Sequence, residues 1–139
     1  MDGRVIIKMP GTLYQIDIDG NLIRNIDVNS IDTSPQDIVF DGKYLWMCGN
    51  TENKIYQLDM DGVLIRSFST AGYETSPQGI AFDGKCLWVC GSTGDKIYKL
   101  DMDGVLIRSF STAGYEAGPS GLAFDGKYLW MAGVGGGVG

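Results

Sequence analysis

Short apolar runs alternate with turn residues along the whole chain. In residues 79–91, "GIAFDGKCLWVCG", two apolar runs stand on either side of an Asp-Gly pair. Runs of about four to eight such residues predict β-strands. Asp-Gly between two of them predicts a tight hairpin of type I′, a turn whose two central residues both need positive φ. No segment has the spacing of about 3.6 residues that predicts an amphipathic helix. The pattern therefore predicts an all-β chain.

The same pattern returns every 42 residues. Residues 55–91 and 97–133 are identical at 29 of 37 positions, which indicates recent duplication or deliberate construction. A fixed period of about 20 to 50 residues indicates stacked supersecondary units. Here the units are about 13–54, 55–96 and 97–138, within a single domain over residues 1–139. The positions that coincide in successive units include Tyr14, Tyr56 and Tyr98; Pro35, Pro77 and Pro119; and Trp46, Trp88 and Trp130.

Each repeat carries four predicted strands. Around the second tryptophan these are residues 78–83, 85–91, 96–102 and 105–112. Four short antiparallel strands in about 40 residues predict one blade of a β-propeller. The first two strands contain "IAF" and "LWV", apolar on both faces, as in a sheet covered on both sides. We therefore expect about three blades per chain, with the three tryptophans buried between neighbouring blades.

The repeat contains two motifs, Pro-x-Gly-x-Ala-Phe-Asp-Gly and Tyr-x-Leu-Asp-x-Asp-Gly. On these motifs the chain resembles the blades of NHL-type propellers, of the streptogramin lyase (virginiamycin B lyase) family and of glutamine cyclotransferase-like propellers. The resemblance covers nearly the whole chain and implies the propeller fold. Those families close rings of five to seven blades, and the lyases use a histidine in catalysis. This chain has material for three blades and no histidine, so the resemblance argues against lyase activity.

Charge and composition narrow the classes of partner. The net charge is −6 and the isoelectric point is about 4.4, which makes nucleic acid and anionic membranes poor partners. No apolar run approaches the roughly 20 residues of a membrane span. The stretch "MDGRVIIKMP" lacks the long apolar centre of a signal peptide. Together with unpaired cysteines, these features lead us to expect a cytoplasmic protein.

Neither the cysteines nor the acidic turns predict a metal or cofactor site. Cys86 and Cys90, four residues apart on one strand, would lie roughly 13 Å apart, too far for a disulfide. Cys48 occupies the same repeat position as Cys90, and no zinc-ligand spacing is present, so all three are expected to be buried free thiols. The Asp-x-Asp-Gly stretches lack the later acidic ligand and the helices of a calcium loop. Their first aspartates are expected to accept hydrogen bonds at the hairpins; these are Asp17, Asp59 and Asp101.

The loops that link the blades carry the candidate ligand-binding side chains. In a propeller these loops emerge on one face, around the mouth of the central channel. The candidates are Gln36, Tyr73, Glu74, Gln78, Tyr115, Glu116 and Ser120. Polar side chains that merely keep the loops soluble are the alternative. Without histidine, no nucleophile–base pair is evident. The sequence therefore favours a non-catalytic module that binds a small molecule or protein, with a fragment of a lyase- or cyclotransferase-type enzyme as the alternative.

The order of the strands predicts self-association. The repeats begin with a third and fourth strand, in "GTLYQIDIDGNLIRNIDV", and end with a first and second strand, in "GLAFDGKYLWMAG". Closed propellers contain about four to eight blades, so three blades do not close a ring alone. Pairing the two half-blades between two copies gives a homodimer with one six-bladed ring. Residues 2–8 compete with residues 125–133 for the second-strand place, and the repeat register favours 125–133.

Overall fold

The computed structural model describes residues 11–116 and 118–133, and every regular element in them is a β-strand. The segment 2–8, which competes for the second-strand place, lies outside the described residues. In chain order the strands are β1 (Thr12–Ile16), β2 (Leu22–Asp27), β3 (Pro35–Phe40), β4 (Leu45–Gly49), β5 (Lys54–Leu58), β6 (Leu64–Ser69), β7 (Pro77–Phe82), β8 (Leu87–Gly91), β9 (Lys96–Leu100), β10 (Leu106–Ser111), β11 (Pro119–Phe124) and β12 (Leu129–Gly133). The all-β prediction is confirmed. Within these residues no helix exists that could span a membrane.

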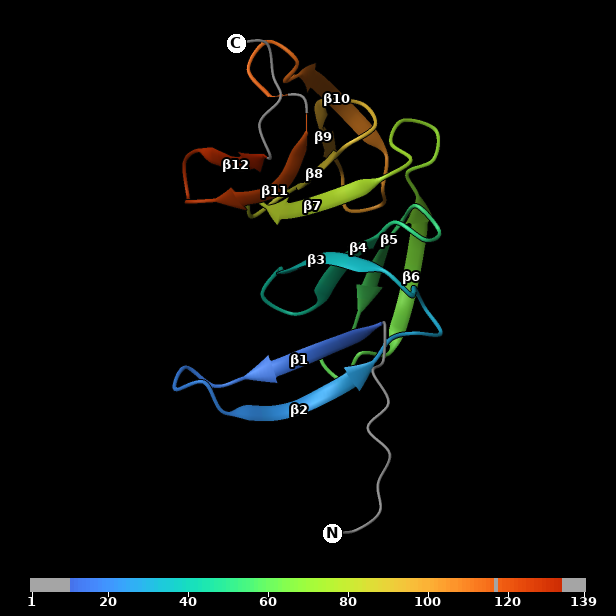
Figure 1. The fold of residues 1–139 in the computed structure, drawn as a ribbon, viewed down its shortest axis with the longest axis vertical. Helices are drawn as coiled ribbons and strands as arrows, with labels where there is room; N and C mark the ends of the chain where they lie inside the picture. The colour runs from blue at the N-terminus through green and yellow to red at the C-terminus, as the bar shows by residue number, and fades with distance from the viewer. Residues whose placement is uncertain (1–10, 117, 134–139) are drawn as a thin grey trace, which may run out of the picture.

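The strands form two complete blades and two half-blades. The complete blades are the antiparallel sheets β3-β4-β5-β6 and β7-β8-β9-β10. The two-stranded sheets β1-β2 and β11-β12 lie on either side of them, so the four sheets follow one another in chain order, with β11-β12 beside β7-β10 (Figure 1). Equivalent strands start 42 residues apart, as β1, β5 and β9 do at Thr12, Lys54 and Lys96. β1-β2 is therefore a third and fourth strand, and β11-β12 a first and second strand.

The first strands of the blades lie side by side. β7 packs against β3 on one side and β11 on the other. Glycine permits the approach of β7 to β11, because a Cβ atom at Gly79 would lie 2.9 Å from the Cα atom of Gly121 and 3.0 Å from the Sγ atom of Cys90. A larger residue at this position would push β7 and β11 apart.

The Asp-Gly hairpins differ from the predicted turn type. In the first of them only Gly42 has positive φ, at +101°, and it is the first of two central residues between Asp41 and Tyr44. A glycine at that position is the requirement of a type II′ turn, so type I′ is wrong. The aspartate precedes the turn: its Oδ1 accepts the amide N–H of Lys43 at 2.8 Å and that of Tyr44 at 2.7 Å. The aspartate therefore holds the turn through its side chain, whereas the glycine supplies the positive φ.

The same aspartate also fixes the tryptophan of its repeat. The Nε1–H of Trp46 donates to Oδ2 of Asp41 at 2.8 Å, and Trp88 makes the same 2.8 Å bond to Asp83. Partial burial acts to raise the pKa of Asp83, but the hydrogen bonds from Cys86, Trp88 and Lys85 outweigh it and hold the pKa below its usual value. The turn thus sets the orientation of a core side chain.

The second series of hairpins uses the first aspartate of Asp-x-Asp-Gly as expected. Oδ1 of Asp17 accepts the amide N–H of Asp19 at 3.0 Å and that of Asn21 at 2.8 Å. Gly20, with φ of +92°, closes this loop as glycine does in three-residue hairpins. Asp59 and Asp101 accept equivalent bonds, so the predicted role of all three aspartates is confirmed.

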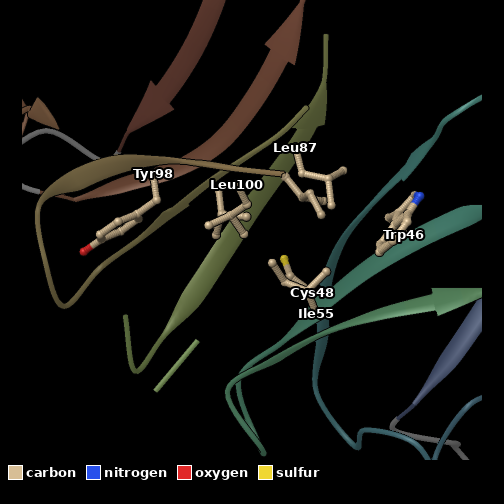
Figure 2. Close-up of a cluster of buried hydrophobic side chains, with 8 residues drawn as sticks. Trp46, Cys48, Ile55, Leu87, Tyr98 and Leu100 are labelled. Carbon is tan, nitrogen blue, oxygen red and sulfur yellow. The ribbon is translucent and has the colours of Figure 1, made fainter. Parts of the chain in front are cut away.

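The main core lies between the two complete blades. Trp46, Cys48 and Ile55 of one blade face Leu87 and Leu100 of the next (Figure 2). A second cluster places Trp88 against residues of β11 and β12. The predicted burial of tryptophan between blades is therefore confirmed for Trp46 and Trp88, which are 1% and 7% exposed.

The prediction is wrong for Trp130 in the single chain, where the side chain is 64% exposed. Its Nε1–H still donates to Asp125 at 2.7 Å, so the local geometry of the repeat is complete. What is missing is a covering layer, because no sheet among the described residues packs over the outer face of β11-β12.

All three cysteines are buried and free, as expected. Burial raises the pKa of the Cys90 thiol to about 12 and also raises that of Cys48. Both thiols are therefore protonated at neutral pH and act as small apolar side chains.

Candidate functional site

Two kinds of loop meet at one end of each blade. The loop between β6 and β7 lies beside the loop between β8 and β9, and the Oγ1–H of Thr75 donates to Oγ1 of Thr93 at 3.0 Å. One repeat earlier, the hydroxyls of Thr33 and Thr51 lie 2.8 Å apart in the same way. This end of the blades carries the candidate ligand residues.

Glu74 lies inside this end and is fully buried. Its Oε2 accepts the amide N–H of Ser76 at 2.9 Å and that of Thr93 at 3.1 Å, while Oε1 accepts the amide N–H of Gly94 at 3.0 Å. The carboxylate therefore joins the two loops from within. A ligand on the surface does not reach it in this arrangement.

The first repeat builds the same junction with a shorter acid. Asp32 is 2% exposed, accepts the amide N–H of Ser34 at 2.8 Å, and accepts the hydroxyl of Tyr56 at 2.7 Å. A glycine makes room for each acid: a Cβ atom at Gly91 would lie 2.3 Å from Cδ of Glu74. The recurrence of glycine at the ends of β4, β8 and β12 is the sequence signal for this buried junction.

Glu116 occupies the equivalent position in the last repeat. Its Oε2 accepts the amide N–H of Gly118 at 2.9 Å, and a Cβ atom at Gly133 would lie 2.2 Å from its Cδ. The side chain is half-buried. The structure thus places the two predicted glutamates, Glu74 and Glu116, at loop junctions.

The two candidate tyrosines lie in different environments. Tyr73 packs against Tyr98 with ring centroids 5.0 Å apart, and burial raises its pKa to about 12. Its buried hydroxyl has no partner among the described residues. Tyr115, one repeat later, is 63% exposed and presents its ring to solvent.

The remaining candidates lie near the start of the first strands of the blades. Nε2–H of Gln36 donates to Oγ of Ser34 at 2.9 Å, and that of Gln78 donates to Oγ of Ser76 at 3.0 Å. Ser120 is exposed, with its hydroxyl donating to the carbonyl of Ala132 at 3.3 Å. The exposed part of the candidate set is therefore Gln36, Tyr115 and Ser120, and Gln78 is half-buried.

Asp37 is a further candidate residue that was not predicted from the sequence. Its Oδ1 accepts a hydrogen bond from the amide N–H of the next residue, Ile38, at 2.9 Å. Its Oδ2 accepts one from the amide N–H of Ile80 on β7 at 3.0 Å. Burial raises its pKa. It also lines an open hollow of about 380 Å³ together with residues of β11 and β12. The signal was available, since the equivalent residues are Gly79 and Gly121.

The acidic side chains of the candidate set lie at separate loop junctions. Among residues 11–116 and 118–133, no three His, Cys, Asp or Glu side chains cluster closely enough to hold a metal ion. The buried acids are held by backbone N–H groups and tyrosine, which leaves hydrogen bonding and aromatic contact as the chemistry of the accessible side chains.

The fold can be compared with solved structures. Virginiamycin B lyase from Staphylococcus aureus, solved as a catalytically inactive variant with quinupristin, superposes with a TM-score of 0.66 at 20% identity, over 90% of this chain and 42% of the lyase. The WD40 domain of Pan2 from Neurospora crassa superposes with a TM-score of 0.64 at 16% identity, over 90% of this chain and 38% of that one. The chain is built of β-propeller repeats.

The repeats of this propeller chain are thus similar to those of enzymes and of WD40 domains alike. A streptogramin B lyase structure matches 88% of the chain, which covers 55% of that lyase, at 18% identity and a TM-score of 0.58. The chain spans less than half the length of virginiamycin B lyase and of the Pan2 domain. No family model and no curated protein sequence matches the chain. At these identities the likeness concerns the fold alone.

Proposed function

We propose that the chain is a non-catalytic β-propeller module that forms a six-bladed ring from two copies and binds a partner on the loop face. The observation that carries the assembly is the complementarity of its two half-blades. In both complete blades the second strand pairs with the third, β4 with β5 and β8 with β9. Within the described residues, β12 is a second strand without a third, and β1 is a third strand without a second.

The register of the missing pairing follows from the two that exist. Trp46 stands opposite Gln57, and Trp88 stands opposite Lys99. Shifting the chain by 42 residues sets Trp130 of one copy opposite Gln15 of the second. The new ladder gives β1 and β12 the backbone partners that an exposed strand edge lacks.

Side-chain exposure supports the same pairing. Tyr14 is 60% exposed, whereas its equivalents Tyr56 and Tyr98 are each 2% exposed. Likewise Trp130 is exposed, whereas its equivalent Trp46 is buried. Exposed aromatic side chains at both ends of the row of sheets are typical of an association surface. Two copies supply six blades, whereas three would supply nine, beyond the range of about four to eight blades in known rings.

The loop face is the proposed binding surface of the ring. Its exposed groups are Gln36, Tyr115 and Ser120, beside the half-buried Gln78, and they suit a ligand or protein recognised by hydrogen bonds and aromatic contact. Two facts support a non-catalytic role. The inactive lyase variant carries an alanine in place of a histidine, and this chain has no histidine.

Sedimentation equilibrium combined with tryptophan fluorescence tests the assembly. We expect twice the chain mass at micromolar concentration and weak quenching by acrylamide or iodide, because Trp130 is covered in the ring. On dilution the emission should shift to the red and become more quenchable, while Trp46 and Trp88 stay buried. A stable monomer at micromolar concentration, with about one third of the emission strongly quenched, would refute the ring.

A further inference from the structure

An ion pair recurs between successive blades. The guanidinium of Arg24 on β2 donates to Oδ1 of Asp61 at 3.0 Å and to the carbonyl of Met60. One repeat later, Arg66 on β6 donates to Oδ1 of Asp103 at 2.8 Å and to the carbonyl of Met102. Each pair joins the last strand of one blade to the turn between the third and fourth strands of the next blade.

The third member of the arginine series has no carboxylate partner in the described part of the chain. Arg108 on β10 lies over the ring of Trp88, 5.9 Å from its centroid, as Arg66 lies over Trp46. The first member of the aspartate series, Asp19, makes no ion pair with any described residue either. Arg108 and Asp19 therefore lie at opposite ends of the row of sheets. Each is one member of the recurring ion pair, and the other member is missing at that end among the described residues.

We propose that Arg108 of one copy binds Asp19 of a second copy, and that this contact selects the partner and the direction of the joint. The inference rests on the proposed ring. In that ring the turn after β1 of the second copy follows the blade that contains Arg108, as the turn after β5 follows the half-blade that contains Arg24. Arg108 then donates to the carboxylate of Asp19 and to the carbonyl of Ile18, which occupies the position of Met60 and Met102.

The pair discriminates against wrong joints. Both charges are satisfied only when the end of the row of sheets that carries β12 meets the end that carries β1. A joint between two identical ends leaves Arg108 or Asp19 without its partner and places like charges on the same side. Such repulsive alternatives are a usual source of specificity.

Solvent limits the strength of each pair. In the internal pairs the arginine side chain is 41–42% exposed and the aspartate 77% exposed. Exposed pairs of this kind stabilise weakly, but a ring of two copies contains two joints. Neutralising the pair at both joints should weaken assembly by about 2- to 30-fold, and reversing one charge, which adds repulsion at both joints, by more than about 10-fold.

Charge reversal gives a test with internal controls. Arg108→Glu alone sets two acids together at both joints, and Asp19→Arg alone sets two arginines together. We expect each variant to assemble at least about 10-fold more weakly than the wild type in sedimentation equilibrium at low salt. An equimolar mixture of the two should form a heterodimer at wild-type concentrations, because each joint then holds one Glu or Asp and one Arg.

The matched control is Arg66→Glu, which breaks the internal pair with Asp103 instead. It should lower the free energy of unfolding and leave the dimer dissociation constant within about 3-fold of the wild-type value. Circular dichroism confirms that each variant is folded. If the wild type is dimeric but both single reversals assemble normally, or their mixture shows no preference for the heterodimer, the charge pair is wrong and the ring stands. If the wild type is monomeric, both are wrong.

Discussion

The fully buried carboxylate of Glu74 offers a sharp test of whether the loop face is organised from within. Replacing it by glutamine keeps the shape of the side chain and exchanges one oxygen acceptor for an N–H₂ donor. Three backbone N–H groups, those of Ser76, Thr93 and Gly94, now point at this carboxylate. A glutamine can turn its oxygen toward Ser76 and Thr93, and its N–H₂ group then faces the N–H of Gly94.

The expected loss of stability follows from the hydrogen bonds that the substitution removes or weakens. One buried backbone donor loses its acceptor, at about 1–3 kcal/mol. Two further bonds lose the assistance of a charge, which removes up to half of their strength. Removing the buried charge offsets part of this loss, since its desolvation no longer opposes folding. The hydroxyl of Tyr98, which lies 3.4 Å from Oε1 of Glu74, keeps a partner, because it also donates to the carbonyl of Tyr73 at 2.8 Å. We therefore expect Glu74→Gln to lower the free energy of unfolding by about 2–3 kcal/mol.

Glu74→Asp is the matched control, because the first repeat already uses Asp32 for the same junction. It keeps the charge and both acceptor oxygens and should cost about 1 kcal/mol for the lost methylene group. Urea unfolding followed by circular dichroism measures both variants at one protein concentration. That concentration should lie well above the dissociation constant of the proposed dimer, since assembly would add to apparent stability. Equal stability of the two variants would refute the hydrogen-bond account, and wild-type stability of both would return Glu74 to the list of ligand-binding residues.

Two further perturbations probe the inner strands. Replacing Cys48, Cys86 and Cys90 by Ala, Tyr and Ala, the residues found at equivalent positions, should leave a folded protein with a modest loss of stability of about 1–3 kcal/mol; loss of the native circular dichroism spectrum would show that the thiols do more than fill space. Burial raises the pKa of Asp37 above its usual 3.8, so the stability that this group contributes is full below that pH and is lost as the pH rises through the raised value. Asp37→Asn should therefore be more stable than the wild type at pH 7 and about equal at pH 3, and urea unfolding at the two pH values would contradict the assignment if the difference were reversed.

The sequence predicts the fold well because each strand is bounded by residues with a local physical role. The 42-residue spacing of glycine, proline and tryptophan is enough to place every strand within about two residues. The predicted turn type was wrong because Asp41 is not one of the two central residues of the turn. It precedes them and accepts hydrogen bonds through its side chain. Local sequence does not distinguish those two uses of an aspartate.

The burial and the hydrogen-bond partners of the candidate residues were less predictable, for reasons that lie in tertiary structure. Glu74 was assigned to the ligand-binding face because it lies in a loop that links two blades, but the glycine at position 91 makes room for it inside. Asp37 was overlooked because it stands beside apolar strand residues. Its contrast with Gly79 and Gly121 marks it in the sequence, and the packing of β3 against β7 shows that its carboxylate bridges two blades. Trp130 is exposed because no blade among residues 11–116 and 118–133 covers β11-β12, which no property of its own repeat reveals.

The position of β1 and β12 at opposite ends of the row of sheets also bears on how long a ring would persist (Figure 1). A subunit in such a ring is held at two joints, so opening one of them leaves the two copies tethered through the other. The freed ends then meet again at the high effective concentration of an intramolecular reaction, in the millimolar range or above for short tethers. A subunit would leave the ring only when both joints are open at the same moment. Subunit exchange between rings would therefore be much slower than the opening of a single joint.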